Sequence, residues 1–306
     1  MNEVNTMAYK IAIASGKGGT GKTTVAVSLL HAMSKNLNTD IRLVDCDVEE
    51  PNDLIFLSEA AIPNKTETIS QAVPRIQPDK CTFCRKCVEF CEFNAIIVIP
   101  PAGFAEVNAS LCHSCGACLV ACPENALTEY LQEIGTVTQF KLKGGRYLYE
   151  GKLSIGSAMQ TMLIRELKNR VNGKADIILY DAPPGTSCPV VETIADTDYV
   201  VLVTEPTPFG LHDLGLMVEL LEKTEKPFGV IVNKAGLGNR DLYDFLSRKK
   251  IEILGEIPFD KEYAHHYSSG NLLGAAWKIM SPYYRKIIDN LEKKISVYDG
   301  NNYFKR

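Results

Sequence analysis

Short, mostly apolar runs alternate with amphipathic stretches along most of the 306-residue chain. Continuous apolar runs are typical of buried parallel strands, whereas apolar residues at every third or fourth position are typical of helices. Strands alternating with helices predict an α/β fold with a doubly wound, mostly parallel sheet. The predicted strands are 11–14, 41–45, 175–180, 199–203, 228–232 and 251–257, and the predicted helices include 21–35, 157–171 and 282–295.

Two further stretches complete this pattern. Residues 134–156 favour two strands joined at Gly144-Gly145, a hairpin. The last predicted helix begins at Pro282, and its apolar stripe has the spacing of a core-packing helix. The pattern of bulky apolar residues opposed to many Lys or Arg, typical of membrane-surface helices, is weak in it, and polar residues 299–302 follow it. We therefore expect no stable membrane insertion.

A glycine-rich turn follows the first apolar run. It fits the phosphate-binding pattern GxxxxGK[ST], with the strand 11–14 before it and a helical pattern after it. Backbone N–H groups and the helix N-terminus would surround the phosphates of ATP, Lys22 would reach the β- and γ-phosphates, and Thr23 would bind Mg²⁺. The predicted phosphate-binding residues are Gly16, Lys17, Gly18, Gly19, Thr20, Gly21, Lys22, Thr23 and Thr24.

Acidic residues end two of the predicted strands. Asp45 and Asp47 follow 41–44, and Asp181 follows 175–180 and precedes a Pro-Pro-Gly turn. Carboxylates at the carboxyl ends of parallel strands beside a phosphate loop are well placed to organise Mg²⁺ and water. A solvated acidic loop is the alternative for Asp47. Cys46 and Cys188 lie outside any metal-binding spacing, and we interpret both as structural.

Eight of the ten cysteines fall in two sets with identical C-x2-C-x2-C-x3-C spacing. The sets are offset by 31 residues, and Asn94-Ala95-Ile96 matches Asn125-Ala126-Leu127, so this part of the chain is an internal duplication. Zinc ribbons use two CxxC pairs with a longer gap, so the spacing favours iron–sulfur clusters over zinc. The cysteines are Cys81, Cys84, Cys87 and Cys91, and Cys112, Cys115, Cys118 and Cys122.

The duplicated segment resembles the bacterial two-cluster ferredoxins. The resemblance implies two [4Fe–4S] clusters with crossed ligation, in which the last cysteine of each set binds the other cluster. Glu92 replaces the proline expected after the first set, which removes no ligand, and His113 is interpreted as a surface or supporting residue. The implied ligand sets are Cys81, Cys84, Cys87 and Cys122, and Cys112, Cys115, Cys118 and Cys91.

The sequence KGGTGKTT, from Lys17 to Thr24, resembles the deviant P-loop of the MinD/ParA/nitrogenase-iron-protein superfamily. The resemblance implies a nucleotide-dependent homodimer in which Lys17 crosses to the partner's nucleotide. It also implies that Asp47 orients the attacking water and that Asp181 binds Mg²⁺, as Thr23 and Asp47 would. By the same resemblance, catalysis depends on Lys17, Lys22 and Asp47, Asn233 contacts adenine, and Pro258 lines its pocket.

Composition limits the classes of function. The net charge of −4 argues against sequence-independent nucleic-acid binding. Polar residues 1–9 lack a signal-peptide core and no run of 18 apolar residues occurs, so we expect a cytoplasmic protein. Adjacent His265 and His266 would not face one metal on a helix and are interpreted as surface residues.

The whole pattern predicts a MinD-like P-loop ATPase domain, residues 1–75 and 129–306, interrupted by a small α+β ferredoxin-like domain, residues 76–128. The leading functional hypothesis is an ATPase whose nucleotide state gates electron transfer through two [4Fe–4S] clusters to an unidentified redox partner. The alternatives are an Mrp-type carrier that delivers clusters to a client protein, and a positioning ATPase with structural clusters. Eight cysteines in two closed sites favour retained clusters over labile ones.

Overall fold

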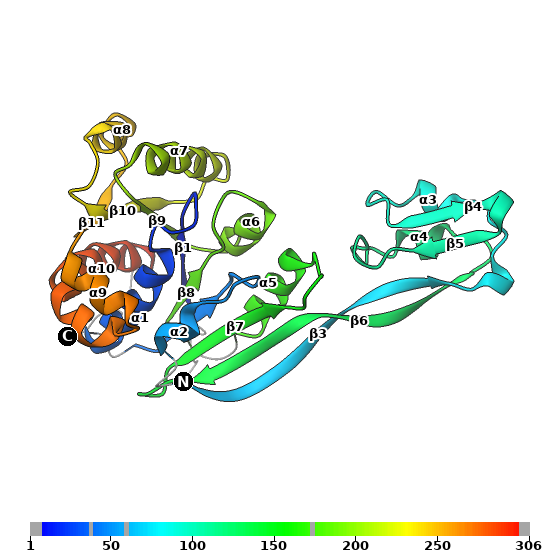
Figure 1. Cartoon of the computed structure of the whole chain (residues 1–306), viewed down its shortest axis with the longest axis horizontal. Helices are drawn as coiled ribbons and strands as arrows, with labels where there is room; N and C mark the ends of the chain where they lie inside the picture. The colour runs from blue at the N-terminus through cyan, green and yellow to red at the C-terminus, as the bar shows by residue number, and fades with distance from the viewer. Residues whose placement is uncertain (1–7, 37–38, 58–60, 172–174, 300–306) are drawn as a thin grey trace.

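A nine-stranded sheet runs through the larger part of the molecule (Figure 1). The computed structural model describes residues 8–36, 39–57, 61–171 and 175–299. The strand order is β11-β10-β9-β1-β8-β2-β7-β6-β3, and all neighbours from β11 to β7 are parallel. The strands are β1 (Tyr9–Ala14), β2 (Ile41–Asp45), β3 (Ile62–Ile76), β6 (Leu127–Lys141), β7 (Tyr147–Leu153), β8 (Ile177–Asp181), β9 (Tyr199–Thr204), β10 (Phe228–Ala235) and β11 (Ile253–Pro258).

Helices cover both faces of this sheet, as predicted for a doubly wound fold. Ile11 and Ile13 of β1 pack in a core with α1 and α10, whereas Ala12 and Ala14 face a second core beneath α5 to α8. This alternation follows from the two-residue period of a strand. The helices are α1 (Lys22–Asn36), α2 (Asp53–Leu57), α5 (Gln160–Asn169), α6 (Cys188–Ile194), α7 (Pro208–Lys223), α8 (Asp241–Lys249), α9 (Lys261–Ser268) and α10 (Trp277–Asp299), with a π-helical turn η4 (Leu272–Ala276) before α10.

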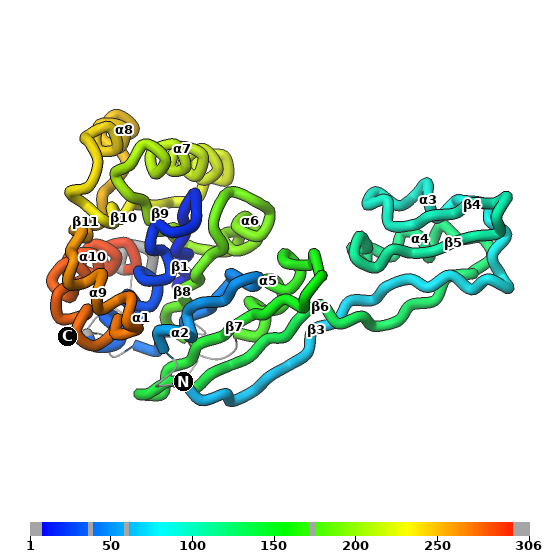
Figure 2. The backbone as a smooth tube through the Cα atoms, viewed as in Figure 1, coloured from blue at the N-terminus to red at the C-terminus, as the bar shows by residue number. Residues whose placement is uncertain are grey.

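A long two-stranded ribbon leaves the edge of this sheet. β3 and β6 are antiparallel over their full length, from the Ile62–Lys141 pair to the Ile76–Leu127 pair. Only residues 135–141 of β6 also pair with β7, so the distal half of the ribbon extends beyond the sheet. Figures 1 and 2 show the ribbon carrying a small unit at its far end, away from the helices of the main body.

The small unit between β3 and β6 has its own secondary structure. Its two-stranded antiparallel sheet packs Ile96 and Val98 against residues of both cysteine sets. A one-turn helix follows the second cysteine of each set, as expected for a duplication. The elements are η2 (Pro78–Lys80), α3 (Lys86–Glu89), β4 (Ile96–Ile99), η3 (Pro100–Ala102), β5 (Phe104–Val107) and α4 (Ala117–Ala121).

Two details differ from the sequence predictions. The hairpin through Gly144-Gly145 is present, but its first strand begins at Leu127 rather than near residue 134. α10 begins at Trp277, so Pro282 lies inside the helix instead of starting it. Burial of Met280, one turn before Tyr284, extends the apolar stripe and stabilises the extra turn despite the proline. The polar segments 1–7 and 300–302 lie outside the described residues.

Candidate functional site

The predicted phosphate loop connects β1 to the N-terminus of α1 and lines a cavity of about 740 Å³. Gly19 and Gly21 have φ values of +78° and +91°, a region that favours glycine. The P-loop residues that line the cavity are Lys17, Gly18, Gly19, Thr20, Gly21, Lys22, Thr23 and Thr24.

Gly16 has a different position from the other predicted phosphate-binding residues. It does not line the cavity, and a Cβ atom there would lie 2.2 Å from the carbonyl oxygen of Asp213 in α7. Glycine at this position therefore permits the close approach of α7 to the loop. At Gly21 a Cβ atom would lie 2.3 Å from Nδ2 of Asn233, which donates a hydrogen bond of 2.7 Å to the carbonyl oxygen of Thr20.

Lys22 and Thr23 both contact Asp181 at the end of β8. Lys22 Nζ lies 2.9 Å from Asp181 Oδ1, and Thr23 Oγ1 donates a hydrogen bond of 2.7 Å to Asp181 Oδ2. Both members of the ion pair are buried. Burial alone would lower the pKa of Lys22, but the charge and hydrogen bond of Asp181, together with the charges of Asp47 and Asp45, raise this pKa. Lys22 thus carries its positive charge beneath the cavity.

Three buried carboxylates gather beside this ion pair. Ligand oxygens of Asp45, Asp53 and Asp181 lie within 4.8 Å of one another. Asp45 accepts hydrogen bonds from the backbone N–H groups of Asp47, Asn52 and Asp53, so it holds the loop after β2 in place. Neither carboxylate oxygen of Asp53 has a hydrogen-bond partner among the described residues. Oxygen-only donors of this kind suit Mg²⁺.

Asp47 was predicted from the sequence to bind the metal, whereas Asp53 was not predicted. In the structure Asp47 lines the cavity but does not belong to the cluster of three carboxylates among the described residues. Burial raises the pKa of Asp47 to about 6, although Lys22 opposes this shift. Burial and the charge of Asp181 raise the pKa of Asp45 to about 8. An acidic residue eight positions after Asp45 was the available signal for Asp53.

Lys17, the second lysine of the loop, is held within its own chain. Its Nζ lies 2.8 Å from Glu205 Oε1, and Lys234 Nζ lies 2.9 Å from Glu205 Oε2. Lys17 also lies 5.9 Å from the centre of the Phe209 ring. Glu205 is one-eighth exposed, so a single carboxylate at the end of β9 neutralises two lysines beside the loop.

The cavity also has aromatic side chains in its lining. Asn233 and Pro258, the predicted adenine-site residues, both line it. Phe56 of α2 and Tyr263 and Tyr267 of α9 also line the cavity, and none of these three was predicted from the sequence. The Phe56 and Tyr267 rings stack with centroids 5.3 Å apart. Planar side chains of this type provide stacking surfaces for a flat ligand. His265 and His266 of the same helix lie outside the cavity lining.

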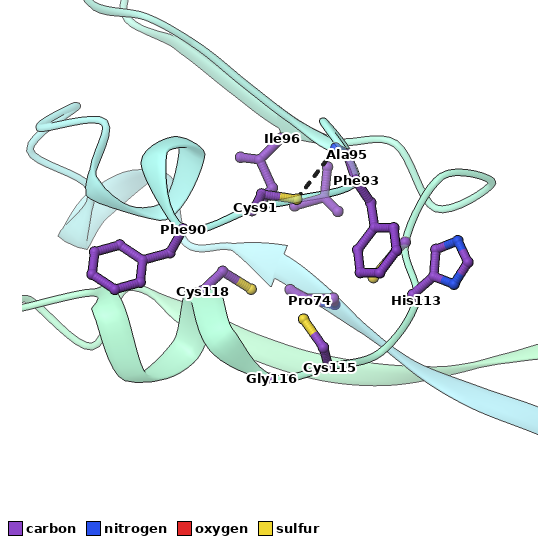
Figure 3. A pocket seen from close by; sticks show the side chains of 12 residues that line it. Pro74, Phe90, Cys91, Phe93, Ala95, Ile96, His113, Cys115, Gly116 and Cys118 are labelled. Carbon is purple, nitrogen blue, oxygen red and sulfur yellow. Dashed lines mark hydrogen bonds between the residues drawn. The ribbon is translucent and has the colours of Figure 1, made fainter.

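The eight predicted cluster ligands form two pockets in the small unit. One pocket is lined by three cysteines of the first set and the last cysteine of the second, and the other pocket has the reciprocal composition (Figure 3). Each pocket therefore contains one implied ligand set. The first pocket contains Cys81, Cys84, Cys87 and Cys122, and the second contains Cys112, Cys115, Cys118 and Cys91.

The two pockets repeat each other in backbone conformation. Left-handed residues recur at the 31-residue offset: Phe83 and Ser114, Arg85 and Gly116, and Asn94 and Asn125. Left-handed residues in such loops form concave groups of backbone N–H donors, which occur at many iron–sulfur sites. The N–H groups of Ala95 and Ala126 donate to Cys91 Sγ and Cys122 Sγ, each over 3.3 Å.

Burial affects the thiols of these pockets. It raises the pKa of Cys87, Cys112 and Cys118, the last to about 11, so burial by itself favours the thiol over the thiolate. Bound cations reverse this preference. His113 stacks on Phe93 at the rim of the second pocket with ring centroids 3.9 Å apart (Figure 3).

The two remaining cysteines differ from each other. Cys46 is fully buried among apolar side chains, as predicted. Cys188 was interpreted as structural, but it is exposed at the first position of α6, so that interpretation is wrong. The N-terminus of α6, which follows the Pro-Pro-Gly turn, lies at the surface, where Ser187 and Cys188 are exposed.

The fold and this site define a P-loop nucleotide-binding protein with a mostly parallel sheet. The chain belongs to the family described as the CobQ/CobB/MinD/ParA nucleotide binding domain, which matches residues 11–273. It is therefore a P-loop ATPase of the MinD/ParA type, which confirms the predicted fold class of the larger domain and the predicted enzyme class.

Its relatives include proteins with and without an assigned role. A Methanocaldococcus jannaschii protein described as uncharacterized is 34% identical over 253 residues, 82% of this chain and 84% of that protein. An iron-sulfur cluster carrier protein of Pyrococcus abyssi is 26% identical over 270 residues, 82% of this chain and 74% of that protein.

A solved structure agrees with the fold. The septum site-determining protein MinD of Pyrococcus horikoshii, complexed with Mg-ADP, has a TM-score of 0.56 at 20% identity, covering 98% of this chain and 100% of that one. At this identity the likeness establishes the fold alone. None of the helices in the described ranges is long and apolar enough to cross a membrane.

Proposed function

We propose that the protein is an ATPase that couples its nucleotide state to electron transfer through two [4Fe–4S] clusters in the unit between β3 and β6. The observation that carries this proposal is the composition of the two cysteine pockets. Each gathers four thiols, three from one set and one from the other. Four thiols and a group of backbone N–H donors fit a cubane cluster, which transfers single electrons when bound.

The nucleotide site supports the ATPase half of the proposal. Lys22 and the N–H groups of the loop would hold the β- and γ-phosphates, and the stacked pair of Phe56 and Tyr267 would offer one aromatic surface to the base. Thr23, Asp181 and the oxygens of Asp53, which have no hydrogen-bond partner among the described residues, form a donor set that fits Mg²⁺. Bound Mg²⁺ would supply charge stabilisation at the phosphates.

The remaining residues act by positioning and charge. Asp47 lines the cavity. Its pKa is raised to about 6, so the carboxylate is still mostly ionised at pH 7. The ionised carboxylate can accept a hydrogen bond from the attacking water. Lys17 would leave Glu205 and contact the nucleotide of a second copy, which produces a nucleotide-dependent homodimer. Phosphoryl transfer depends mainly on such positioning and electrostatic stabilisation.

The test is the anaerobic ATPase rate of the purified protein with its clusters oxidised and then reduced by dithionite. Lys22→Ala is the control, because loss of this cation removes nucleotide hydrolysis in either state. We expect the rate to depend on the redox state. An equal rate in both states, together with transfer of the clusters to an apo-ferredoxin, would overturn gating in favour of the carrier function named for the relative that is 26% identical.

A second measurement tests the crossed ligation. We expect Cys122→Ser to remove the same reduced-state electron paramagnetic resonance signal as Cys87→Ser, because both thiols line the first pocket. Cys118→Ser should remove the other signal. If Cys122→Ser instead matches Cys118→Ser, each set binds its own cluster and the proposed ligand sets are wrong.

A further inference from the structure

Three basic residues surround the ligands of the first cysteine pocket. Lys80 precedes Cys81, and Arg85 and Lys86 follow Cys84 directly. All three side chains are exposed, and Arg85 lines the pocket itself. Cys84 is an exposed cysteine, so this is a face where the first pocket approaches solvent.

The internal duplication provides a comparison within the same chain. At the 31-residue offset, Leu111, Gly116 and Ala117 occupy the positions of the three basic residues. Residues 109–120 contain no Lys, Arg, Asp or Glu, whereas residues 78–89 contain the three cations and only two acidic residues. The net charge of the whole chain is −4. The basic residues are therefore a property of the first pocket and not of the duplicated unit.

Arg85 occupies a backbone position that favours glycine. Its φ value is +64°, and its counterpart Gly116 has a φ value of +72°. Left-handed backbone is unfavourable for a residue with a Cβ atom, and arginine has no short polar side chain to compensate. A strained residue at the rim of a proposed cofactor site indicates that its side chain has a role there.

Lys80, Arg85 and Lys86 differ from many other cations of the described residues, which form ion pairs. Across the described ranges of the chain, no side-chain hydrogen bond or ion pair involves Lys80, Arg85 or Lys86. By contrast, Arg75, at the end of the ribbon, lies 4.7 Å from the centre of the Tyr130 ring. Exposed, unpaired cations around one site attract a partner of opposite charge and accelerate its association.

We propose that Lys80, Arg85 and Lys86 form a docking surface for an acidic electron-transfer protein, which exchanges electrons with the first pocket. This proposal rests on the proposed function, since it requires a cluster in that pocket. One electron passes between the cluster and the prosthetic group of the bound protein, so one is oxidised as the other is reduced. The described lining of the second pocket contains no Lys, Arg, Asp or Glu, and includes the stacked Phe93 and His113, so this partner does not dock there.

The experiment measures electron exchange by anaerobic stopped flow between the holoprotein and an acidic plant-type ferredoxin. The test variant is Lys80→Glu with Lys86→Glu. The matched control is Lys141→Glu with Lys143→Glu, which makes the same charge change at exposed positions of the β6–β7 hairpin. We expect the test variant to lower the second-order rate constant at least fivefold and to abolish its decrease with salt, and the control to leave both unchanged.

Arg85→Gly distinguishes the effect of losing the arginine side chain from an effect on folding. Glycine relieves the left-handed strain, so this variant should retain its clusters and resist denaturant at least as well as the wild type. It should still lower the rate constant two- to threefold with the acidic ferredoxin. Reduction by the methyl viologen radical, a small cation, should not slow in any variant.

The outcomes separate this proposal from the proposed function. Absence of iron and acid-labile sulfide in the wild type would overturn both. Full cluster content with an unchanged rate in the test variant, or an equal loss in the control, would overturn the docking surface alone. Salt-sensitive self-association that disappears in the test variant would assign this surface to a second copy of the chain and overturn the proposal of an acidic carrier.

Discussion

Asp53→Asn tests the carboxylate cluster through the pH dependence of stability. Asp53 is fully buried, and its oxygens have no hydrogen-bond partner among the described residues. Burial, together with the nearby charges of Asp45 and Asp181, raises the pKa of Asp53 well above its ordinary value of 3.8. Asparagine has nearly the same shape and does not ionise, so the substitution removes the titration and preserves the packing.

Because the pKa of Asp53 is raised in the folded protein, Asp53 makes the protein less stable as pH rises. The stability that the protonated carboxyl contributes is fully present below the unfolded pKa of 3.8 and is lost as pH rises toward the folded pKa. In that window one carboxyl lowers the free energy of unfolding by about 1.4 kcal/mol per pH unit. Between pH 5 and 7, the metal-free Asp53→Asn variant should therefore gain up to about 2.7 kcal/mol relative to the wild type.

Urea unfolding of the metal-free and nucleotide-free protein at pH 5, 6 and 7 measures this gain. Trp277 is the chain's one tryptophan and packs against His31 and Tyr284, so its fluorescence reports on the ATPase domain. Asp289→Asn, at an exposed position of α10, is the matched control. Equal pH slopes for Asp53→Asn and the wild type would refute the assignment of a protonated, buried Asp53. Addition of Mg²⁺ and ATP should stabilise the wild type more than the variant.

Two other substitutions test the loop. Glu205→Gln removes the charge that retains Lys17, so the ATP concentration needed for dimerisation should fall up to about fivefold. Analytical ultracentrifugation measures this concentration. An unchanged or higher ATP concentration would contradict the proposed release of Lys17 from Glu205. Gly21→Ala places a Cβ atom 2.3 Å from Asn233 Nδ2 at a φ value of +91°, so it should destabilise the protein by about 2–3 kcal/mol in thermal unfolding. Gly145→Ala, with positive φ but open space, should cost only about 1 kcal/mol, and equal losses for the two variants would show that the clash with Asn233 is unimportant.

Local sequence signals were sufficient for the features that depend on neighbouring residues. The strand, glycine turn and helix around Lys22 are continuous in the chain, and Asp181 follows its strand directly, so the pattern predicted their order and the structure places their side chains in contact. The fixed spacing of the cysteines likewise indicated two compact loops. Features of this kind need no knowledge of distant contacts.

The missed features depend on distant contacts. β3 contains Pro63 and Pro74, which argue against a central strand, but β3 is the edge of the sheet, where an N–H group is not required on the outer side. Asp53 looked like one more polar residue of a loop, because only the fold brings it to Asp181. The aromatic wall combines Phe56 and Tyr267, which are far apart in the chain, so no local pattern could show their stacking.

The ribbon of β3 and β6 separates the two kinds of chemistry in this protein. Residues 127–134 of β6 extend beyond the pairing with β7, which at about 3.3 Å per residue is about 26 Å. Charges screen one another over about 8–10 Å in physiological salt, so the γ-phosphate cannot act on the cysteine pockets through its electric field. The proposed coupling would therefore be mechanical. With the ribbon as a lever arm, a tilt of about 10° at β7 would displace the far end of the ribbon by about 5 Å.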